Sequence, residues 1–323
     1  MKAILHERYG RPDVLELRDV DKPTIGDDQV LVRVHASSVN PVEWYGVSGP
    51  YFARLGNGMR RPKDQTVGAD LAGVVEAVGR DVTQFEPGDE VFGVSGGSWA
   101  EYTIAREERL AKKPDNLSFE EAAAVPVAAV TALQALRDKG QVQAGQKVLI
   151  NGASGGVGTF AIQLAKLFGA DVTAVCSTGN VEQARSLGAD RVVDYTKDDF
   201  TDGRVRYDVV QDNVGNHPLR RLRRAVTPTG TLVSNAGGSP DGNLLGPIPA
   251  IVRMLAVNAV VRQRLRPLPD TWTREHLLAV TELVAAGQVT PVVGRTYPLA
   301  DTAAAMHHLE QGHARGKVVV TVG

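Results

Sequence analysis

Three small residues at fixed spacing, Ala153, Gly155 and Gly158, match the arrangement that phosphate-binding loops use. They follow a β-branched run that is typical of a buried strand, and a helical pattern follows them. In such a strand–turn–helix, the first position makes the tight turn, the second lets a pyrophosphate approach the main chain, and the third lets helix and strand pack closely. Free N–H groups and the helix macrodipole then favour an anion. The spacing predicts a dinucleotide-binding loop made of Ala153, Ser154, Gly155, Gly156, Val157 and Gly158, and the alternative is a purely structural glycine-rich turn.

The residues after the next expected strand indicate which dinucleotide this loop prefers. NAD-binding proteins usually carry Asp or Glu there, roughly 20 residues after the glycines, to bind the ribose 2′-hydroxyl. This chain has Ser177, Thr178, Gly179 and Asn180 instead. No carboxylate in this stretch repels a 2′-phosphate, and Ser177, Thr178 and Asn180 offer neutral donors. The expected cofactor is therefore NADPH, with NADH less favoured, although no basic residue in the stretch strengthens the choice.

Strands and helices alternate from Gln146 onward, which is typical of a doubly wound parallel sheet. Up to about residue 115 the chain is instead rich in short Val-containing strands and turns. Ser118 and Glu121 then have the spacing of a capping box, and Pro126 divides the helical stretch that follows. The expected strands of the sheet are residues 147–151, 171–176, 191–195, 207–211 and 230–235, and the expected helices are residues 157–168, 181–187, 217–226 and 250–264.

Length and composition limit the possible classes of protein. A chain of 323 residues is long enough for about two domains. The net charge of −1 argues against a nucleic-acid or membrane partner bound by bulk electrostatics. The one cysteine, Cys176, excludes an internal disulfide and a Cys-rich zinc site. No apolar run approaches the ~20 residues that cross a bilayer, so a cytoplasmic protein is expected.

Six segments in the same order resemble the medium-chain dehydrogenase/reductase superfamily, and within it the zinc-free quinone oxidoreductase branch. The resemblance extends over nearly the whole chain, and several ordered motifs are far more specific than one glycine pattern. The segments are SSVNPVEWYGVSGPY (residues 37–51), VGADLAGVVEAVG (67–79), FEPGDEVFG (85–93), GASGGVG (152–158), SLGADRVVDY (186–195) and RGKVVVTV (315–322).

The resemblance implies an α/β protein with two domains. Residues 1–123 and 267–323 are expected to form a GroES-like, β-rich catalytic domain, and residues 124–266 a Rossmann dinucleotide-binding domain inserted between them. The active site is expected in the cleft between the two domains. The same resemblance implies a homodimer.

Zinc-dependent members of the superfamily hold a catalytic zinc with ligands that this chain lacks. The place of the first cysteine is Val39-Asn40-Pro41, and the place of the G-H-E motif is Gly68-Ala69-Asp70. Cys176 lies on an expected strand of the Rossmann domain, where it cannot join such a site. Because a tetrahedral catalytic zinc requires three protein ligands, no metal is expected. Asp70 is left as a candidate site residue or as a cap of a turn.

The resemblance places the candidate catalytic residues between Asn40 and Tyr51. Asn40 is expected to contact the nicotinamide side of the cofactor or the substrate oxygen, and Tyr45 to donate a hydrogen bond to the acceptor. Tyr51 matches a position that lines the cleft. The alternative for Tyr45 and Tyr51 is that both are packing residues with satisfied hydroxyls.

Further cofactor contacts are expected from strand ends and from the C-terminal segment. The carboxyl ends of parallel strands bind ligands in a doubly wound sheet, which indicates Val214 and residues 235–237. The resemblance adds Thr131, Tyr195 and a C-terminal pair, for which a solvated pair before a strand is the alternative. The full set of expected contacts outside the loop is Asn40, Thr131, Ser177, Thr178, Asn180, Tyr195, Val214, Asn235, Ala236, Gly237, Arg315 and Lys317.

Without a metal to lower the pKa of an alcohol, reduction of an electrophilic acceptor is the easier reaction. The leading hypothesis is zinc-independent hydride transfer from NADPH to a quinone or a related electron-poor carbonyl compound. The first alternative is reduction of the double bond of an enone or enoyl thioester on the same scaffold, with Tyr45 as candidate proton donor. An NADPH-binding sensor or accessory protein with little turnover is the alternative of another class.

Overall fold

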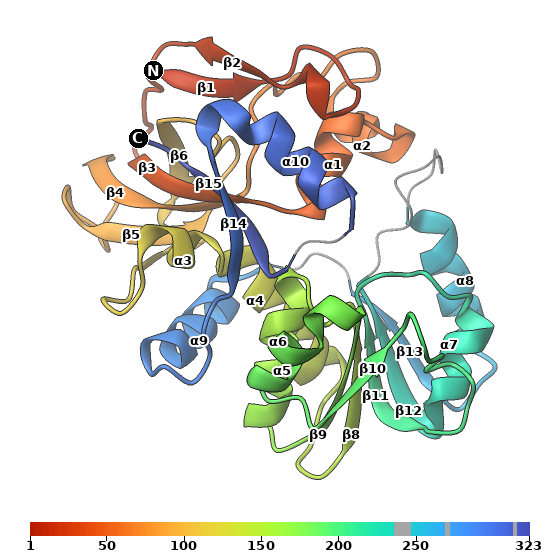
Figure 1. Cartoon of the computed structure of the whole chain (residues 1–323). Helices are drawn as coiled ribbons and strands as arrows, with labels where there is room; N and C mark the ends of the chain where they lie inside the picture. The colour runs from red at the N-terminus through yellow and green to blue at the C-terminus, as the bar shows by residue number, and fades with distance from the viewer. Residues whose placement is uncertain (236–246, 269–271, 313–314) are drawn as a thin grey trace. The chain divides into compact units, whose positions relative to one another are not determined.

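The chain divides into two compact units, which are described separately. The computed structural model describes residues 1–235, 247–268, 272–312 and 315–323. One unit contains Met1–Val130 and Trp272–Gly323, and the other contains Thr131–Thr271. The divisions lie a few residues after the expected domain boundaries at 123/124 and 266/267. Figure 1 shows each unit built around its own sheet.

The first unit is built on a seven-stranded sheet whose centre is the 11-residue strand β3 (Gln29–Val39). The strand order is β14-β15-β3-β4-β5-β7, and β6 also pairs with β3. Strand β3 runs antiparallel to β4, β6 and the C-terminal strand β15. These strands are β4 (Asp70–Val78), β5 (Glu90–Val94), β6 (Tyr102–Arg106), β7 (Leu110–Lys112), β14 (Val293–Pro298) and β15 (Lys317–Thr321), and a separate antiparallel pair is β1 (Lys2–Leu5) with β2 (Glu16–Asp19).

Pairing between distant parts of the chain determines what lies at the end of β3. Val318 of β15 is the partner of Val39, and Leu71 of β4 is the partner of Ser37. The beginnings of β4 and β15 therefore lie on either side of the residues that leave β3. A buried cluster around the fully buried Trp99 packs against this region. Burial of apolar side chains from both ends of the chain therefore supports the register.

Helices of the first unit begin where the sequence supplies a cap. Ser118 and Glu121 form the predicted capping box, with Glu121 N donating to Ser118 Oγ at 3.2 Å and Ser118 N donating to Glu121 Oε2 at 2.9 Å. Pro126 separates the two predicted helical pieces, because proline fits the first turn of a helix. The helices are α1 (Pro41–Ser48), α2 (Tyr51–Asn57), α3 (Phe119–Ala123), α4 (Pro126–Leu133, which crosses the division between units), α9 (Arg274–Ala285) and α10 (Thr302–Glu310).

The second unit is a six-stranded parallel sheet in the order β10-β9-β8-β11-β12-β13. The order reverses between β8 and β11, which makes their carboxyl ends the switch point where doubly wound sheets bind ligands. This confirms the predicted α/β class with a Rossmann-type sheet (Figure 1). The strands are β8 (Lys147–Asn151), β9 (Asp171–Cys176), β10 (Arg191–Asp194), β11 (Tyr207–Asp212), β12 (Val226–Ser234) and β13 (Arg264–Pro267).

One element of the second unit differs from the sequence-based expectation. The predicted helix over residues 250–264 is wrong at its end, because α8 covers Ile248–Asn258 and Arg264 begins the strand β13. Leu265 of this short strand is fully buried against the Leu232 partner in β12, so tertiary packing overrides the helical pattern. The other helices are α5 (Gly156–Leu167), α6 (Val181–Ser186) and α7 (Leu219–Ala225).

Among the described residues, no helix is both long enough and apolar enough to cross a membrane.

Candidate functional site

The glycine-rich loop lies at the carboxyl end of β8 and leads into α5. Gly152 has φ +78°, the left-handed conformation that favours glycine. The tight turn therefore lies at Gly152, one residue before the predicted position Ala153. A Cβ at Gly158 would lie 2.1 Å from the carbonyl oxygen of Gly152. The glycine at 158 therefore lets α5 pack directly against the turn, as predicted for the third position.

The middle glycine leaves the main chain at the start of α5 uncovered. Gly155 is the N-cap of this 12-residue helix and supplies no side-chain cap. A Cβ added there would meet only the Gly152 oxygen, at 3.7 Å. The first N–H groups of a helix have no partner within the helix, so they remain available to an anion. Residues 152–158 thus form a main-chain cradle that fits a pyrophosphate, with Ser154 in the turn and Gly156 and Val157 at the start of the helix.

The carboxyl end of β11 joins the loop through the buried carboxylate of Asp212. Its Oδ1 accepts hydrogen bonds from Asn151 Nδ2 at 2.8 Å and from the N–H groups of Val214 and Gly215 at 3.2 and 3.1 Å. The N–H of Asn235 donates to the Asp212 carbonyl oxygen at 2.9 Å. The predicted residues Val214 and Asn235 thus lie at the same edge as the glycine loop. Ala236 and Gly237 lie outside the described residues.

Four predicted residues lie just after the ends of β9 and β10, namely Ser177, Thr178, Asn180 and Tyr195. Asn180 is buried, and its Nδ2 donates to Ser177 Oγ at 3.2 Å. The hydroxyl of Thr178 donates to the carboxylate of Asp194 at 2.5 Å, so its proton is already used within the protein. Tyr195 follows Asp194, and its side chain is exposed. Sequence analysis missed Asp194, because only the pairing of β9 with β10 brings it beside Thr178.

A second polar cluster is buried at the end of β3 in the other unit. Asn40 Nδ2 donates to Asp70 Oδ2 at 2.9 Å and to Glu43 Oε1 at 3.2 Å. Lys317 Nζ donates to Asn40 Oδ1 and lies 3.2 Å from Asp70 Oδ2. The side chain of Asp70 is also fixed by Val127 N, which donates to its Oδ1 at 2.8 Å. The cluster therefore ties together β3, β4, β15 and the start of α4.

Asn40 and Lys317 were predicted separately, and the structure brings them into contact. Their exposed fractions are 3% and 4%, and their polar atoms face one another and Asp70. A contact of either with a cofactor stays a prediction. The cluster also includes Glu43, which sequence analysis missed. Its position three residues after Asn40 is the signal that could have found it, because that spacing lets its carboxylate accept from Asn40 N, here at 2.7 Å.

Burial and the neighbouring Asp70 carboxylate raise the pKa of Glu43 to about 7, while Lys317 and the hydrogen bond from Asn40 limit the rise. Glu43 Oε1 also accepts from Ala69 N at 3.0 Å. The carboxyl groups of Glu43 and Asp70 thus lie in a buried cluster with a single ammonium group, that of Lys317. The protonation of Glu43 consequently changes the charge of this cluster close to neutral pH.

The remaining candidates are more exposed. Tyr45 is half-buried on α1, its ring lies edge-on to Trp44 with centroids 5.3 Å apart, and burial raises the pKa of its hydroxyl. Tyr51 is 48% exposed at the start of α2, beside the guanidinium of Arg54. Arg315 is exposed before β15, whereas Thr131 is partly buried on α4. Tyr45 and Tyr51 belong to the same unit as the Asn40–Glu43–Asp70–Lys317 cluster.

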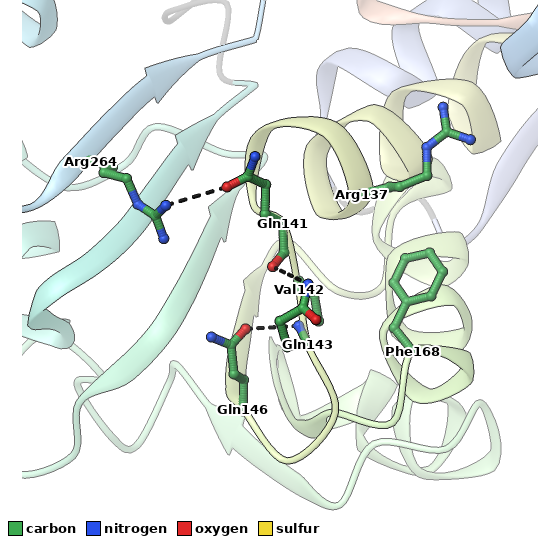
Figure 2. A pocket seen from close by; sticks show the side chains of 7 residues that line it. All are labelled: Arg137, Gln141, Val142, Gln143, Gln146, Phe168 and Arg264. Carbon is green, nitrogen blue, oxygen red and sulfur yellow. Dashed lines mark hydrogen bonds between the residues drawn. The ribbon is translucent and has the colours of Figure 1, made fainter.

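A cavity of about 480 Å³ in the second unit contains none of the predicted residues. Figure 2 shows its lining, which includes Gln146 just before β8 and Arg264 at the start of β13. It therefore lies at the amino ends of these strands, away from the glycine loop at the carboxyl end of β8. The other lining residues are Arg137, Gln141, Val142, Gln143 and Phe168.

No group of three or more His, Cys, Asp or Glu side chains in the described part of the chain is placed to hold a metal ion.

Replacement of Glu43 by Gln should remove a pH dependence of stability. A carboxyl whose folded-state pKa is raised stabilises the fold below its unfolded pKa, and this stability is lost as pH rises through the folded value near 7. Relative to Glu43→Gln, the wild type should lose about 2–3 kcal/mol of unfolding free energy between pH 5 and pH 8. Urea unfolding at several pH values measures this difference. Parallel curves for the two proteins would contradict the assignment.

Alanine substitutions should separate the two roles of the loop glycines. Gly158→Ala should destabilise the protein by about 1–3 kcal/mol, because its Cβ overlaps the Gly152 carbonyl. Gly155→Ala should leave stability unchanged, because its Cβ has room, and should weaken nucleotide binding by covering the cradle. Thermal unfolding and nucleotide titration measure the two effects, with Gly96→Ala as control because nothing lies within 4 Å of its Cβ. Equal effects of the Gly155 and Gly158 substitutions on stability would contradict this division.

Two parts of the chain match known families. Residues 26–115 match the alcohol dehydrogenase GroES-like domain, and residues 187–320 match the zinc-binding dehydrogenase family. The first match covers strands of the seven-stranded sheet, and the second includes β10 to β15.

Similar proteins cover almost the whole chain. A 2-methylene-furan-3-one reductase of Solanum lycopersicum is 36% identical over 99% of this chain and 79% of its own length. The chloroplastic NADPH-dependent alkenal/one oxidoreductase of Arabidopsis thaliana is 35% identical over the same shares of both chains. The solved structure of the quinone oxidoreductase from Coxiella burnetii is 32% identical, covers 100% of this chain and 99% of its own, and gives a TM-score of 0.86.

The similarity to these relatives extends over both units of the chain. One unit is GroES-like, and the other is a Rossmann-type unit with the glycine-rich loop at the switch point of its sheet. The chain belongs to the medium-chain dehydrogenase/reductase superfamily and is an oxidoreductase of its quinone oxidoreductase type.

Proposed function

We propose that this protein uses NADPH to reduce quinones or α,β-unsaturated carbonyl compounds. The observation that carries the proposal is the main-chain cradle of residues 152–158 at the switch point of the parallel sheet. The names of the relatives support the acceptor class, because they include an alkenal/one oxidoreductase, a furanone reductase and a quinone oxidoreductase. These acceptors share a polarised carbonyl that makes the carbonyl carbon or a carbon conjugated to it electrophilic.

The cofactor would be held by groups of the second unit. The N–H groups at the start of α5 are proposed to bind the pyrophosphate, because the Gly155 N-cap leaves them uncovered. Ser177, Asn180 and Tyr195, which follow the ends of β9 and β10, are proposed as contacts for the adenosine. NADPH, when bound, supplies the hydride. Val214 and Asn235 are proposed as contacts farther along the same edge, where the Asp212 carboxylate fixes the main chain.

On the acceptor side, Tyr45 is proposed to donate a hydrogen bond to the carbonyl oxygen, or a proton to the neighbouring carbon of an enone. Burial raises the pKa of Tyr45, so its hydroxyl remains protonated at neutral pH and is able to donate. Tyr51 is proposed as an exposed contact for the acceptor.

We also propose that the reaction needs no zinc. The positions that would supply metal ligands carry Asn40 and Ala69, and the nearby carboxylate of Asp70 is already paired with the ammonium of Lys317. A buried ammonium beside this carboxylate opposes the entry of a divalent cation by electrostatic repulsion.

A homodimer and a cytoplasmic location complete the proposal. The outer edge of β13 has no partner strand among the described residues, which leaves main-chain groups for a second copy. The one cysteine, Cys176, is a buried free thiol, which suits a reducing compartment.

Purified protein should oxidise NADPH in the presence of 1,4-benzoquinone and of 4-hexen-3-one, and more slowly with NADH. Absorbance at the nicotinamide band measures the rate with each of the four combinations. Treatment with a chelator should leave the rates unchanged, because no step uses a metal. Absence of turnover with both acceptors and both cofactors would contradict the proposed function, and loss of activity on chelation would contradict the zinc-independent route.

Replacement of Tyr45 by Phe should lower kcat with at least one acceptor class by about 100- to 1000-fold, because loss of a single donor to a developing negative charge has that effect. The matched control is Tyr102→Phe, whose ring lies under the ammonium of Lys22 in a different part of the sheet. Steady-state kinetics with both acceptors measures the change. Unchanged turnover with every acceptor would show that Tyr45 is a packing residue.

A further inference from the structure

An ionised carboxylate stands beside the segment expected to receive the ribose of the cofactor. Asp194 ends β10 next to Cys176, the last residue of β9. Its Oδ1 accepts from the N–H and hydroxyl of Thr196 at 3.1 and 2.7 Å. Its Oδ2 accepts from Thr178 and lies 3.3 Å from Lys197 Nζ. The hydrogen bonds from Thr178 and Thr196 hold the pKa of this carboxyl well below its usual range.

This arrangement changes the charge expected around the ribose 2′ position. The second strand ends in neutral residues, but the third strand brings Asp194 to the same edge. Thr178 has one hydroxyl proton and donates it to Asp194, so Thr178 is left without a proton for a phosphate oxygen. A 2′-phosphate bound beside this segment would therefore meet a negative charge and would lack one of the donors expected from the sequence.

Lys197 is the basic side chain attached to this network. Its side chain is 67% exposed, and its ammonium forms an i,i+3 ion pair with the carboxylate of Asp194. The side chain of Asp194 is 11% exposed, so only the lysine end of the pair lies in solvent. Water screens an ion pair that has a solvent-exposed partner, so the ammonium is able to move at modest cost. It carries three donors, which is enough to keep a contact with Asp194 and to bind a phosphate oxygen at the same time.

We propose that Lys197 binds the 2′-phosphate of the cofactor and is the residue that makes the protein prefer a 2′-phosphorylated nucleotide. The inference rests on the proposed function, since it assigns the preference of the same nucleotide site. Lys197 neutralises Asp194 in the free protein and bridges Asp194 and the phosphate in the complex. A nucleotide without this phosphate leaves the pair between Lys197 and Asp194 as it is.

Binding of two mononucleotides by isothermal titration calorimetry tests the assignment without turnover. Wild-type protein should bind 2′,5′-ADP more tightly than 5′-AMP. Lys197→Gln should weaken 2′,5′-ADP binding by about tenfold, as expected for one charged hydrogen bond, and leave 5′-AMP binding unchanged. The control is Arg185→Gln, which removes another ion pair of the same i,i+3 spacing with an exposed basic partner, between Arg185 Nη1 and Glu182 Oε1 at 2.9 Å. This control should leave both affinities unchanged.

The outcomes separate this inference from the proposed function. Equal affinities of wild type and Lys197→Gln for 2′,5′-ADP would overturn the role of Lys197 and leave the proposed function standing. Equal weakening of both nucleotides by the substitution would also overturn that role, because it would show a general effect on the site. A wild-type protein that binds neither nucleotide, and oxidises neither NADPH nor NADH, would overturn the proposed function and this inference together.

Discussion

The close approach of α5 to the turn after β8 is the constraint on which the nucleotide end of this protein depends. No Cβ fits at Gly158, because the carbonyl oxygen of Gly152 would lie 2.1 Å from it. The absence of a side chain there brings the first turn of α5 to the carboxyl end of β8, where its unpaired N–H groups point away from the helix. Gly152 contributes the left-handed turn, and Gly155 leaves the space in front of the helix open. The cradle thus follows from three positions at which the main chain itself forms the surface.

A different kind of constraint shapes the other unit. The pairing of β3 with both β4 and β15 brings Asn40, Asp70 and Lys317 into one buried cluster, although Lys317 lies 277 residues after Asn40. Burial makes each of these groups depend on the others, because an unpaired charge in the interior is costly. Glu43 joins the cluster from α1, and its protonation links the charge of the cluster to pH. The residues predicted as separate cofactor contacts are therefore parts of one interdependent polar network.

The sequence was sufficient to predict those parts of the fold that are determined by local patterns of residues. The alternation after Gln146, the capping box at Ser118 and the division at Pro126 all depend on neighbouring residues, and the structure confirms them. The helix expected up to Arg264 was wrong, because β13 is a four-residue strand that exists only through its pairing with β12. Asp194 was missed for the same reason, because only the pairing of β10 with β9 brings it beside Thr178. Glu43 differs, because its capping-box spacing from Asn40 is a local signal, whereas its contacts with Asp70 and Ala69 depend on the pairing of β3 with β4.

The central claim is that the pyrophosphate of a dinucleotide lies against the main chain around Gly155. The most direct measurement is a crystal structure of this protein grown with NADPH. The account predicts density for the pyrophosphate within hydrogen-bond distance of the N–H groups at the start of α5. Density for the cofactor at another place, with the cradle of residues 152–158 vacant, would contradict it.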